Sequence, residues 1–177
     1  MQLLLGEIQL VLTGRNEQLP APVPYRNFIA HARSISPSEH EAYFRAQLAD
    51  MEEPTAPFGI LDVHGDGKQV DETRVAFDDE LAMRIYSAAR RHSVTPAVLF
   101  HVAWAQVLAR CSASDDVVFG TVLSGRLQAA QSAGRVVGMF INTLPIRVRL
   151  RGNVRDVVQE THRGLAELFT HEQASLA

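Results

Sequence analysis

The sequence predicts an α/β fold, a two-layer sandwich in which strands are partly sheltered by helices. Two observations lead to this prediction. Before residue 50 the chain has only helical patterns, separated by a proline-rich segment. From residue 70 onward, short apolar or alternating stretches take turns with longer stretches of helical periodicity. The sequence has no repeat with a period of about 20 to 50 residues, which excludes a solenoid or a propeller.

Helices are expected where apolar residues recur at helical spacing after a capping residue or a proline. The expected capping residues are Ser36, Asp78, Thr95 and Asn153. The expected helices cover residues 1–13, 37–49, 79–91 and 96–110, and a final helix begins at residue 154. Residues 25–33 are expected to form a short turn or helix. The stretch 96–110 is apolar nearly all round, so we expect it to be the central helix.

Strands are expected where residues alternate in polarity or form short apolar runs. These stretches cover residues 74–77, 117–123, 139–144 and 146–150. In the last of them Arg147 and Arg149 alternate with apolar residues, so we expect both arginines to face water or a partner. Prolines and glycines between residues 50 and 69 indicate a lobe boundary or a long surface connection.

The charge balance excludes two classes of partner. Seventeen Lys and Arg face 20 Asp and Glu, a formal charge of −3, with both signs interspersed. We therefore expect no nucleic-acid footprint and no membrane-binding patch. The sequence has one cysteine, Cys111, which excludes an internal disulfide and suits a reducing compartment. Cytoplasm is the expected location, and Cys111 is expected to be a buried structural thiol.

The seven histidines are scattered and show no metal-binding spacing such as HExxH. We therefore expect no metal site. His64 lies in Val63-His64-Gly65-Asp66-Gly67, which resembles a catalytic loop but is more typical of a surface turn.

Polar residues also occur where apolar strands end or are interrupted. Ser124, Gly125 and Arg126 follow an apolar run, and Arg126 fits a structural ion pair and a site residue equally well. Asn142 and Thr143 interrupt an otherwise apolar strand. Because buried polar groups need hydrogen bonds, these two side chains either bond neighbouring backbone at a bulge or line a cavity.

Four segments, taken in order, resemble motifs of the condensation domains of nonribosomal peptide synthetases. The segments are PYRNF (24–28), VVFGTVLSGR (117–126), VGMFINTLPIR (137–147) and HEQASL (171–176). In the first of them, Asn27 stands where the family usually has Asp. Together the four matches cover nearly the whole chain, which makes the resemblance more specific than any single motif.

The resemblance implies a fold like that of chloramphenicol acetyltransferase, with two lobes around a tunnel that admits phosphopantetheine arms. It also implies amide formation between aminoacyl or peptidyl thioesters held on carrier proteins, so the chain itself would bind no cofactor directly. The expected partners are peptidyl carrier protein domains and the remainder of the condensation domain or synthetase. The family's catalytic HHxxxDG motif does not occur in these residues. We expect an incomplete domain that begins just after that motif and stops before the closing strands. By this resemblance, residues 1–57 are the tail of the N-terminal lobe with its connector, and residues 58–177 are most of the C-terminal lobe.

Carried over by residue, the resemblance gives site residues but no catalytic one. Arg126 resembles the arginine that pairs with the aspartate of HHxxxDG and supports that loop. Ser124, Gly138, Asn142 and Thr143 match loop-supporting or tunnel positions. His171 matches a motif position to which we assign no catalytic role.

Two other functions remain open at this point. The chain could be a noncatalytic module that docks a carrier protein or a partner subunit. It could also be a free-standing acyltransferase that uses His64 or His171. In an incomplete domain we further expect exposed apolar surface.

Overall fold

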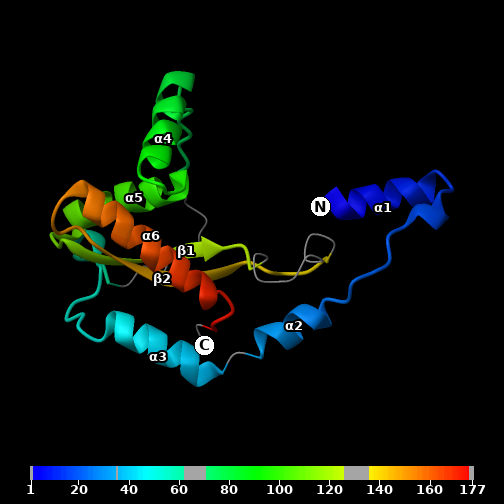
Figure 1. Cartoon of the computed structure of the whole chain (residues 1–177), viewed down its shortest axis with the longest axis horizontal. Coiled ribbons are helices and arrows are strands. Elements are labelled where there is room, and N and C mark those ends of the chain that lie inside the picture. The colour runs from blue at the N-terminus through cyan, green and yellow to red at the C-terminus, as the bar shows by residue number, and fades with distance from the viewer. Residues whose placement is uncertain (1, 35, 62–70, 126–135, 176–177) are drawn as a thin grey trace. The chain divides into compact units, whose positions relative to one another are not determined.

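A computed structural model describes residues 2–34, 36–61, 71–125 and 136–175 (Figure 1). Six α-helices are present in these residues, and they confirm the expected helices to within two residues at each expected end. The helices are α1 (Gln2–Leu12), α2 (Arg26–Ala32), α3 (Pro37–Leu48), α4 (Asp79–Arg91), α5 (Pro96–Ser112) and α6 (Val154–Thr170). Two strands, β1 (Asp116–Leu123) and β2 (Asn142–Arg149), and two short 3-10 helices, η1 (Asn16–Gln18) and η2 (Pro57–Gly59), complete the described elements.

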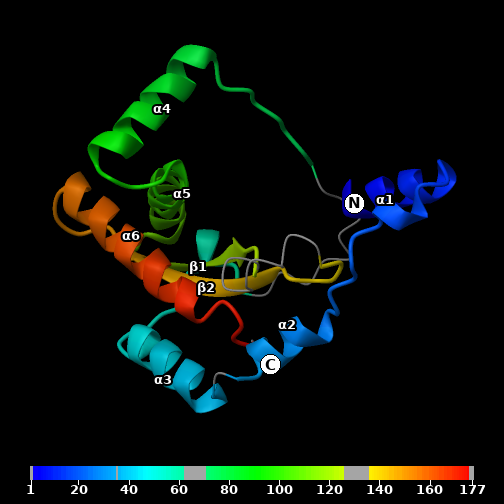
Figure 2. The same cartoon turned by 45° about the vertical axis from the view of Figure 1, so that its right-hand side comes forward.

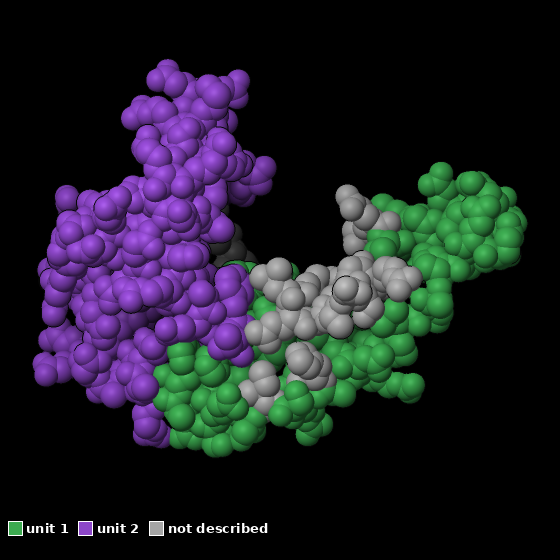
Figure 3. All heavy atoms as spheres, in the orientation of Figure 1, with its two compact units in different colours: residues 1–43, 122–144, 171–177 green, residues 44–121, 145–170 purple. Residues whose placement is uncertain are grey.

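The chain divides into two compact units, which Figure 3 colours separately. The first unit contains residues 1–43, 122–144 and 171–177, and the second contains residues 44–121 and 145–170. The lobe boundary at residue 57 stays a prediction.

The core of the second unit is built around α5, which contacts both α4 and α6 (Figures 1 and 2). Its buried residues recur at helical spacing, as the sequence predicts: Val98, Val102, Ala105 and Leu108. From α6, the residues Val157, Val158, Thr161, Leu165 and Leu168 are buried. Other parts of α5 are open, since Phe100, Trp104 and Val107 are each about half exposed. Although α5 is apolar nearly all round, only part of its surface is therefore buried.

The two strands pair to form a two-stranded sheet. A single strand, β2, replaces the two expected over 139–144 and 146–150, so that division was wrong. Pro145 lies inside β2, which a two-stranded sheet tolerates because each strand has a free edge. The strand expected over 74–77 is also wrong: these residues form no regular structure, and Val75 is 78% exposed. Within the described residues no strand pairs with this stretch, so its alternation forms no ladder.

Of the two alternatives expected for Arg147, water or a partner, water is wrong, since its side chain is only 5% exposed. Nε and Nη2 donate to the two oxygens of Asp116 in β1 at 2.8 and 2.7 Å, a bidentate pair. Nη1 donates to the carbonyl of Gln47 at 2.8 Å and to the carboxylate of Asp50. Arg149 adds longer contacts to the same two aspartates, 3.5 Å to Asp50 and 3.6 Å to Asp116. The polar face of β2 therefore joins β1 to the end of α3.

The expected caps were confirmed at two helices. Asp78 accepts from the amide of Leu81 at 2.7 Å, and Asn153 accepts from the amide of Asp156 at 2.9 Å. Thr95 is also the N-cap residue of α5, as expected, but its side chain makes no capping hydrogen bond, and the helix starts with Pro96 in its first turn. Cys111 is half-buried, less enclosed than expected.

Among the described helices, none is by itself long and apolar enough to cross a membrane. The helices α4 and α5 would reach the required length and composition only as a pair, and they meet at a bend of 103°.

Replacing Arg147 by Gln should lower the free energy of unfolding by about 3 kcal/mol, because the enclosed carboxylate of Asp116 loses its bidentate cation. Urea denaturation at pH 7 measures this change.

A matched control is Arg151→Gln, which removes an Arg–Asp pair of the same chemistry at the surface. Arg151 and Asp115 are 67% and 55% exposed, so the control should leave the unfolding midpoint within experimental error. Equal losses of unfolding free energy in the two variants would show that burial does not explain the stabilising effect of the Arg147 network.

Candidate functional site

Five of the six predicted site residues lie in the first unit: Ser124, Gly138, Asn142, Thr143 and His171. They come from three separate stretches: the residue after β1, residues 138–143 before and at the start of β2, and the turn after α6. Arg126, the sixth, lies outside the described residues, as does His64. The first unit therefore contains these five positions, while residues 117–121 and 145–147 of the motif segments belong to the second unit.

Asn142 connects two of these stretches. Its Nδ2 donates to the carbonyl of Glu172 at 2.9 Å and to the carbonyl of Ala174 at 2.7 Å. Its Oδ1 accepts from the amide of Thr143 at 2.9 Å. The sequence left two alternatives for Asn142, bonding to neighbouring backbone or lining a cavity. In the structure its side chain bonds backbone, both at the neighbouring Thr143 and in a turn that is distant in sequence. The amide thus holds the start of β2 against the turn at residues 171–174.

Two glycines permit close approach within this unit. A Cβ on Gly125, whose φ is +63°, would overlap the carbonyl oxygen of Phe140. A Cβ on Gly138 would overlap the ring of Tyr25. Any other residue at either position must displace its neighbour, so both positions require glycine. The motif glycine at 138 therefore has a packing role in the described structure.

Tyr25 belongs to an aromatic cluster that packs on residues 138–140, just before β2. Its ring lies 5.3 Å from that of Phe28 and 5.4 Å from that of Phe140, and the last two rings are 4.5 Å apart. The hydroxyl of Tyr25 also donates to the carbonyl of Met139. This cluster gives the Tyr25 and Phe28 positions of the first motif a structural purpose: they fix residues 138–140.

His171 lies against α3. Its Nδ1 is 2.9 Å from Nδ1 of His40, and its ring stacks on Tyr43 with 4.0 Å between centroids. Burial, followed by the electrostatic effect of the neighbouring His40, lowers the pKa of His171, while Glu39 acts in the opposite direction. The neutral imidazole is therefore favoured at this position.

The sequence reasoning missed His40 and Tyr43. Their spacing of three residues on an expected helix indicates only that they share a face. What makes them part of the unit is a partner 131 residues away from His40, which helical periodicity does not reveal.

The remaining predicted residues, Ser124 and Thr143, have exposed side chains at the ends of the two strands. Among the described residues, no three His, Cys, Asp or Glu side chains come together as a metal-binding group.

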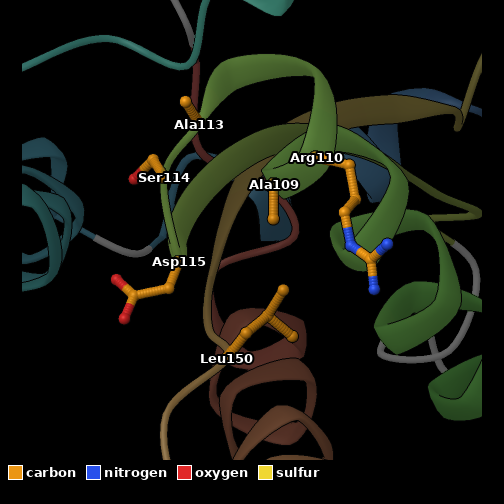
Figure 4. A pocket seen from close by; sticks show the side chains of 6 residues that line it. All are labelled: Ala109, Arg110, Ala113, Ser114, Asp115 and Leu150. Carbon is orange, nitrogen blue, oxygen red and sulfur yellow. The ribbon is translucent and has the colours of Figure 1, made fainter.

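A surface hollow of about 540 Å³ lies in the second unit, where α5 ends and β1 begins (Figure 4). It is lined by Ala109, Arg110, Ala113, Ser114, Asp115 and Leu150. Arg110 and Asp115 extend to opposite sides of it (Figure 4). Asp115 is already paired with Arg151 at 3.0 Å, and that pairing lowers the pKa of its carboxyl. None of the motif residues lines this hollow, so it is not the candidate site.

Comparison with known families adds a decisive observation. The family model described as the Condensation domain matches residues 1–176. The chain belongs to the condensation domain family. This confirms the resemblance that the four motifs carry, and it confirms the α/β fold class.

Relatives of this condensation-domain chain are large synthetases. Malpinin synthetase of Mortierella alpina is 48% identical over 172 residues, which cover 96% of the chain and 2% of that protein. Surfactin synthase subunit 2 of Bacillus subtilis is 32% identical over 173 residues, 98% of the chain and 5% of that protein. The chain thus spans a few per cent of the length of these curated relatives.

Solved structures show the same fold. The first condensation domain of the CDA synthetase superposes with a TM-score of 0.69 at 23% identity, covering 93% of this chain and 37% of that chain. The condensation domain of the Monacolin K polyketide synthase gives 0.63 at 18% identity, with 84% and 36% covered. The chain corresponds to somewhat more than a third of each solved chain.

Replacing Asn142 by Asp keeps the shape of the side chain but places an anionic oxygen beside the carbonyls of Glu172 and Ala174. We expect the free energy of unfolding at pH 7 to fall by about 2 kcal/mol, because two donated hydrogen bonds become repulsions. The loss should shrink as the pH falls toward about 4, because the neighbouring carbonyls raise the pKa of the new carboxyl in the folded chain, and its protonated form again offers a donor. Denaturation across pH measures both effects.

The matched control for this variant is Asn27→Asp, which makes the same chemical change at an exposed position. It should leave stability at pH 7 nearly unchanged. A loss for Asn142→Asp that does not respond to acid would argue against the hydrogen-bond explanation.

Replacing Gly125 by Ala should destabilise the chain more than Gly14→Ala does. Both glycines have positive φ, +63° and +70°, so both variants carry the same backbone strain of about 1 to 2 kcal/mol. Only at Gly125 does the new Cβ meet the Phe140 carbonyl, whereas nothing lies within 4 Å at Gly14. Urea unfolding of both variants isolates the steric part, and equal losses would remove close packing as the reason for glycine.

Proposed function

We propose that this chain is the part of a condensation domain that supports, but does not itself supply, the catalytic histidine of amide-bond formation. In this reaction the amine of an acceptor aminoacyl thioester attacks a donor thioester. The donor chain is transferred to the amine, and the thiol of the donor carrier leaves. The substrates are carried on phosphopantetheine arms of partner peptidyl carrier proteins, and the reaction takes place in the cytoplasm.

One observation carries this proposal. Asn142 of the VGMFINTLPIR segment holds the HEQASL segment by two hydrogen bonds, of 2.9 and 2.7 Å, in a unit that also contains the PYRNF segment. Three stretches with family motifs thus support one another through specific contacts. An arrangement of this kind favours a shared functional framework over an incidental similarity at each motif.

The described side chains fit a framework role. Asn142 and the ring of Tyr25 are engaged in internal contacts, and Nδ1 of His171 faces His40. We therefore assign binding and positioning to this chain. Arg126 would support the loop that bears HHxxxDG, with Ser124 and Thr143 facing the substrate tunnel. The activating histidine belongs to the HHxxxDG motif, which these 177 residues do not contain.

The test is a segment exchange in malpinin synthetase, whose matching 172 residues are 48% identical to this chain. The exchanged condensation domain should transfer an aminoacyl group from donor to acceptor carrier protein, detected by mass spectrometry of the carrier-bound product. The purified 177-residue chain alone should give no product above a protein-free reaction, since it brings no HHxxxDG histidine.

Two variants in the exchanged domain sharpen this test. Asn142→Ala should reduce turnover at least about tenfold, because it releases the motif segments from one another. Arg151→Gln, at an exposed pair, should leave turnover unchanged. Product from the isolated chain would instead support a free-standing acyltransferase. An inactive exchanged domain that still binds loaded carrier protein saturably would support the docking module.

A further inference from the structure

Two histidines far apart in the sequence meet in the first unit. Nδ1 of His40, in α3, lies 2.9 Å from Nδ1 of His171, in the turn after α6. One helical turn along α3, Tyr43 stacks on the His171 ring with an angle of 18° between the ring planes. His40 is only 8% exposed. The two rings therefore form a junction between α3 and the turn, in which His40 is buried and His171 is half-buried.

The distance between the two nitrogens restricts their protonation. A hydrogen bond between two imidazole nitrogens needs one N–H and one lone pair, so the accepting ring is neutral. Nε2 of His40 is buried and has no hydrogen-bond partner among the described residues. An unpaired buried N–H is less tolerable than an unpaired lone pair. This assigns the proton of His40 to Nδ1, which donates to Nδ1 of a neutral His171.

The turn held by His171 is the same one that holds Asn142. The carbonyl of His171 accepts from the amide of Ala174 at 2.8 Å, which closes the turn. The carbonyls of Glu172 and Ala174 accept from Asn142. His40 and Asn142 therefore contact a single four-residue turn, and at most three residues of backbone separate the two contacts.

We propose that His40 is a positioning residue of the condensation domain: by donating to His171 it fixes the turn at residues 171–174, whose carbonyls orient Asn142 and the segment that begins β2. The inference rests on the proposed function for its consequence in catalysis. Its structural part, the coupling of His40 to the turn, can be measured without any turnover.

The charges around His171 agree with this assignment. Burial and the neighbouring His40 lower the pKa of His171, and Glu39 of α3 opposes them. The other titratable groups next to the ring are Tyr43, stacked on it, and Glu172, which follows it in the turn. Protonation of His171 at Nδ1 removes the acceptor of the pair. The contact therefore persists while His171 is neutral and breaks in acid.

The experiment compares His40→Leu with His40→Asn in the full 177-residue chain. Leu removes the donor, whereas the Asn side-chain amide can place an N–H close to where Nδ1 of His40 lies. Amide hydrogen exchange should become at least about tenfold faster at Ala174 in the Leu variant and stay within about threefold of the parent in the Asn variant. His171 should titrate closer to 6.5 in the Leu variant, as followed by NMR.

The control is His162→Leu, a half-buried histidine of α6 in the second unit, which should change neither readout. In the parent, nitrogen NMR should show protonated Nδ1 at His40 and unprotonated Nδ1 at His171. Unchanged exchange at Ala174 in His40→Leu would overturn the proposal. If His40→Leu does not fold, two other measurements test the proposal: the tautomers in the parent chain and amide hydrogen exchange at Ala174 in His40→Asn. The opposite tautomers would overturn the proposal. Exchange more than threefold faster in a folded His40→Asn chain would also overturn it.

Turnover in the exchanged synthetase domain separates the two proposals. His40→Leu should lower kcat at least about fivefold with KM little changed, and His40→Asn should restore most of it. If the synthetase domain that carries the unmutated segment is inactive, the proposed function fails. Amide hydrogen exchange in the 177-residue chain then still tests the role of His40. If the parent is active and His40→Leu is equally active, the positioning role is overturned while the proposed function stands.

Discussion

A buried guanidinium needs partners for its donors, and Arg147 finds them on three different segments. The carboxylates of Asp116 and Asp50 and the carbonyl of Gln47 accept from it, so β1, β2 and the end of α3 meet at one charged group. An apolar residue at this place could pack against its neighbours but could not select among them. The directed hydrogen bonds therefore give the second unit a specific arrangement in addition to its apolar core of α5 and α6.

The first unit uses the same device with a neutral side chain. Asn142 offers two N–H donors, and both meet carbonyls of the turn after α6 at 2.9 and 2.7 Å. Close packing adds to these hydrogen bonds, because Gly125 and Gly138 carry no Cβ and so leave room for Phe140 and Tyr25. The family's motif residues in this unit are thus explained to a large extent by mutual support, before any contact with a substrate is considered.

The sequence predicted the helices well because their signals are local: apolar periodicity and the caps Asp78 and Asn153 act within a few residues. It failed where the outcome depends on a distant partner. Arg147 looks like a water-facing residue of an alternating strand until Asp116 and Asp50 are placed beside it. The motif positions Gly138, Asn142 and His171 could be named from resemblance, whereas the partner of His171, His40, could not, because 131 residues separate them.

The two polar networks respond to acid in different ranges. The pKa of His171 is lowered in the folded chain, so the stability that its neutral form contributes is complete above 6.5 and is lost as pH falls below that value. The pKa of the Asp50 carboxyl is lowered by its hydrogen bond to Arg147, so its contribution is complete above 3.8 and is lost only as pH falls further. Mild acid therefore acts first on the histidine junction and leaves the arginine network intact. The turn that holds Asn142 is then the part of the candidate site most sensitive to protons, although Asn142 itself does not titrate.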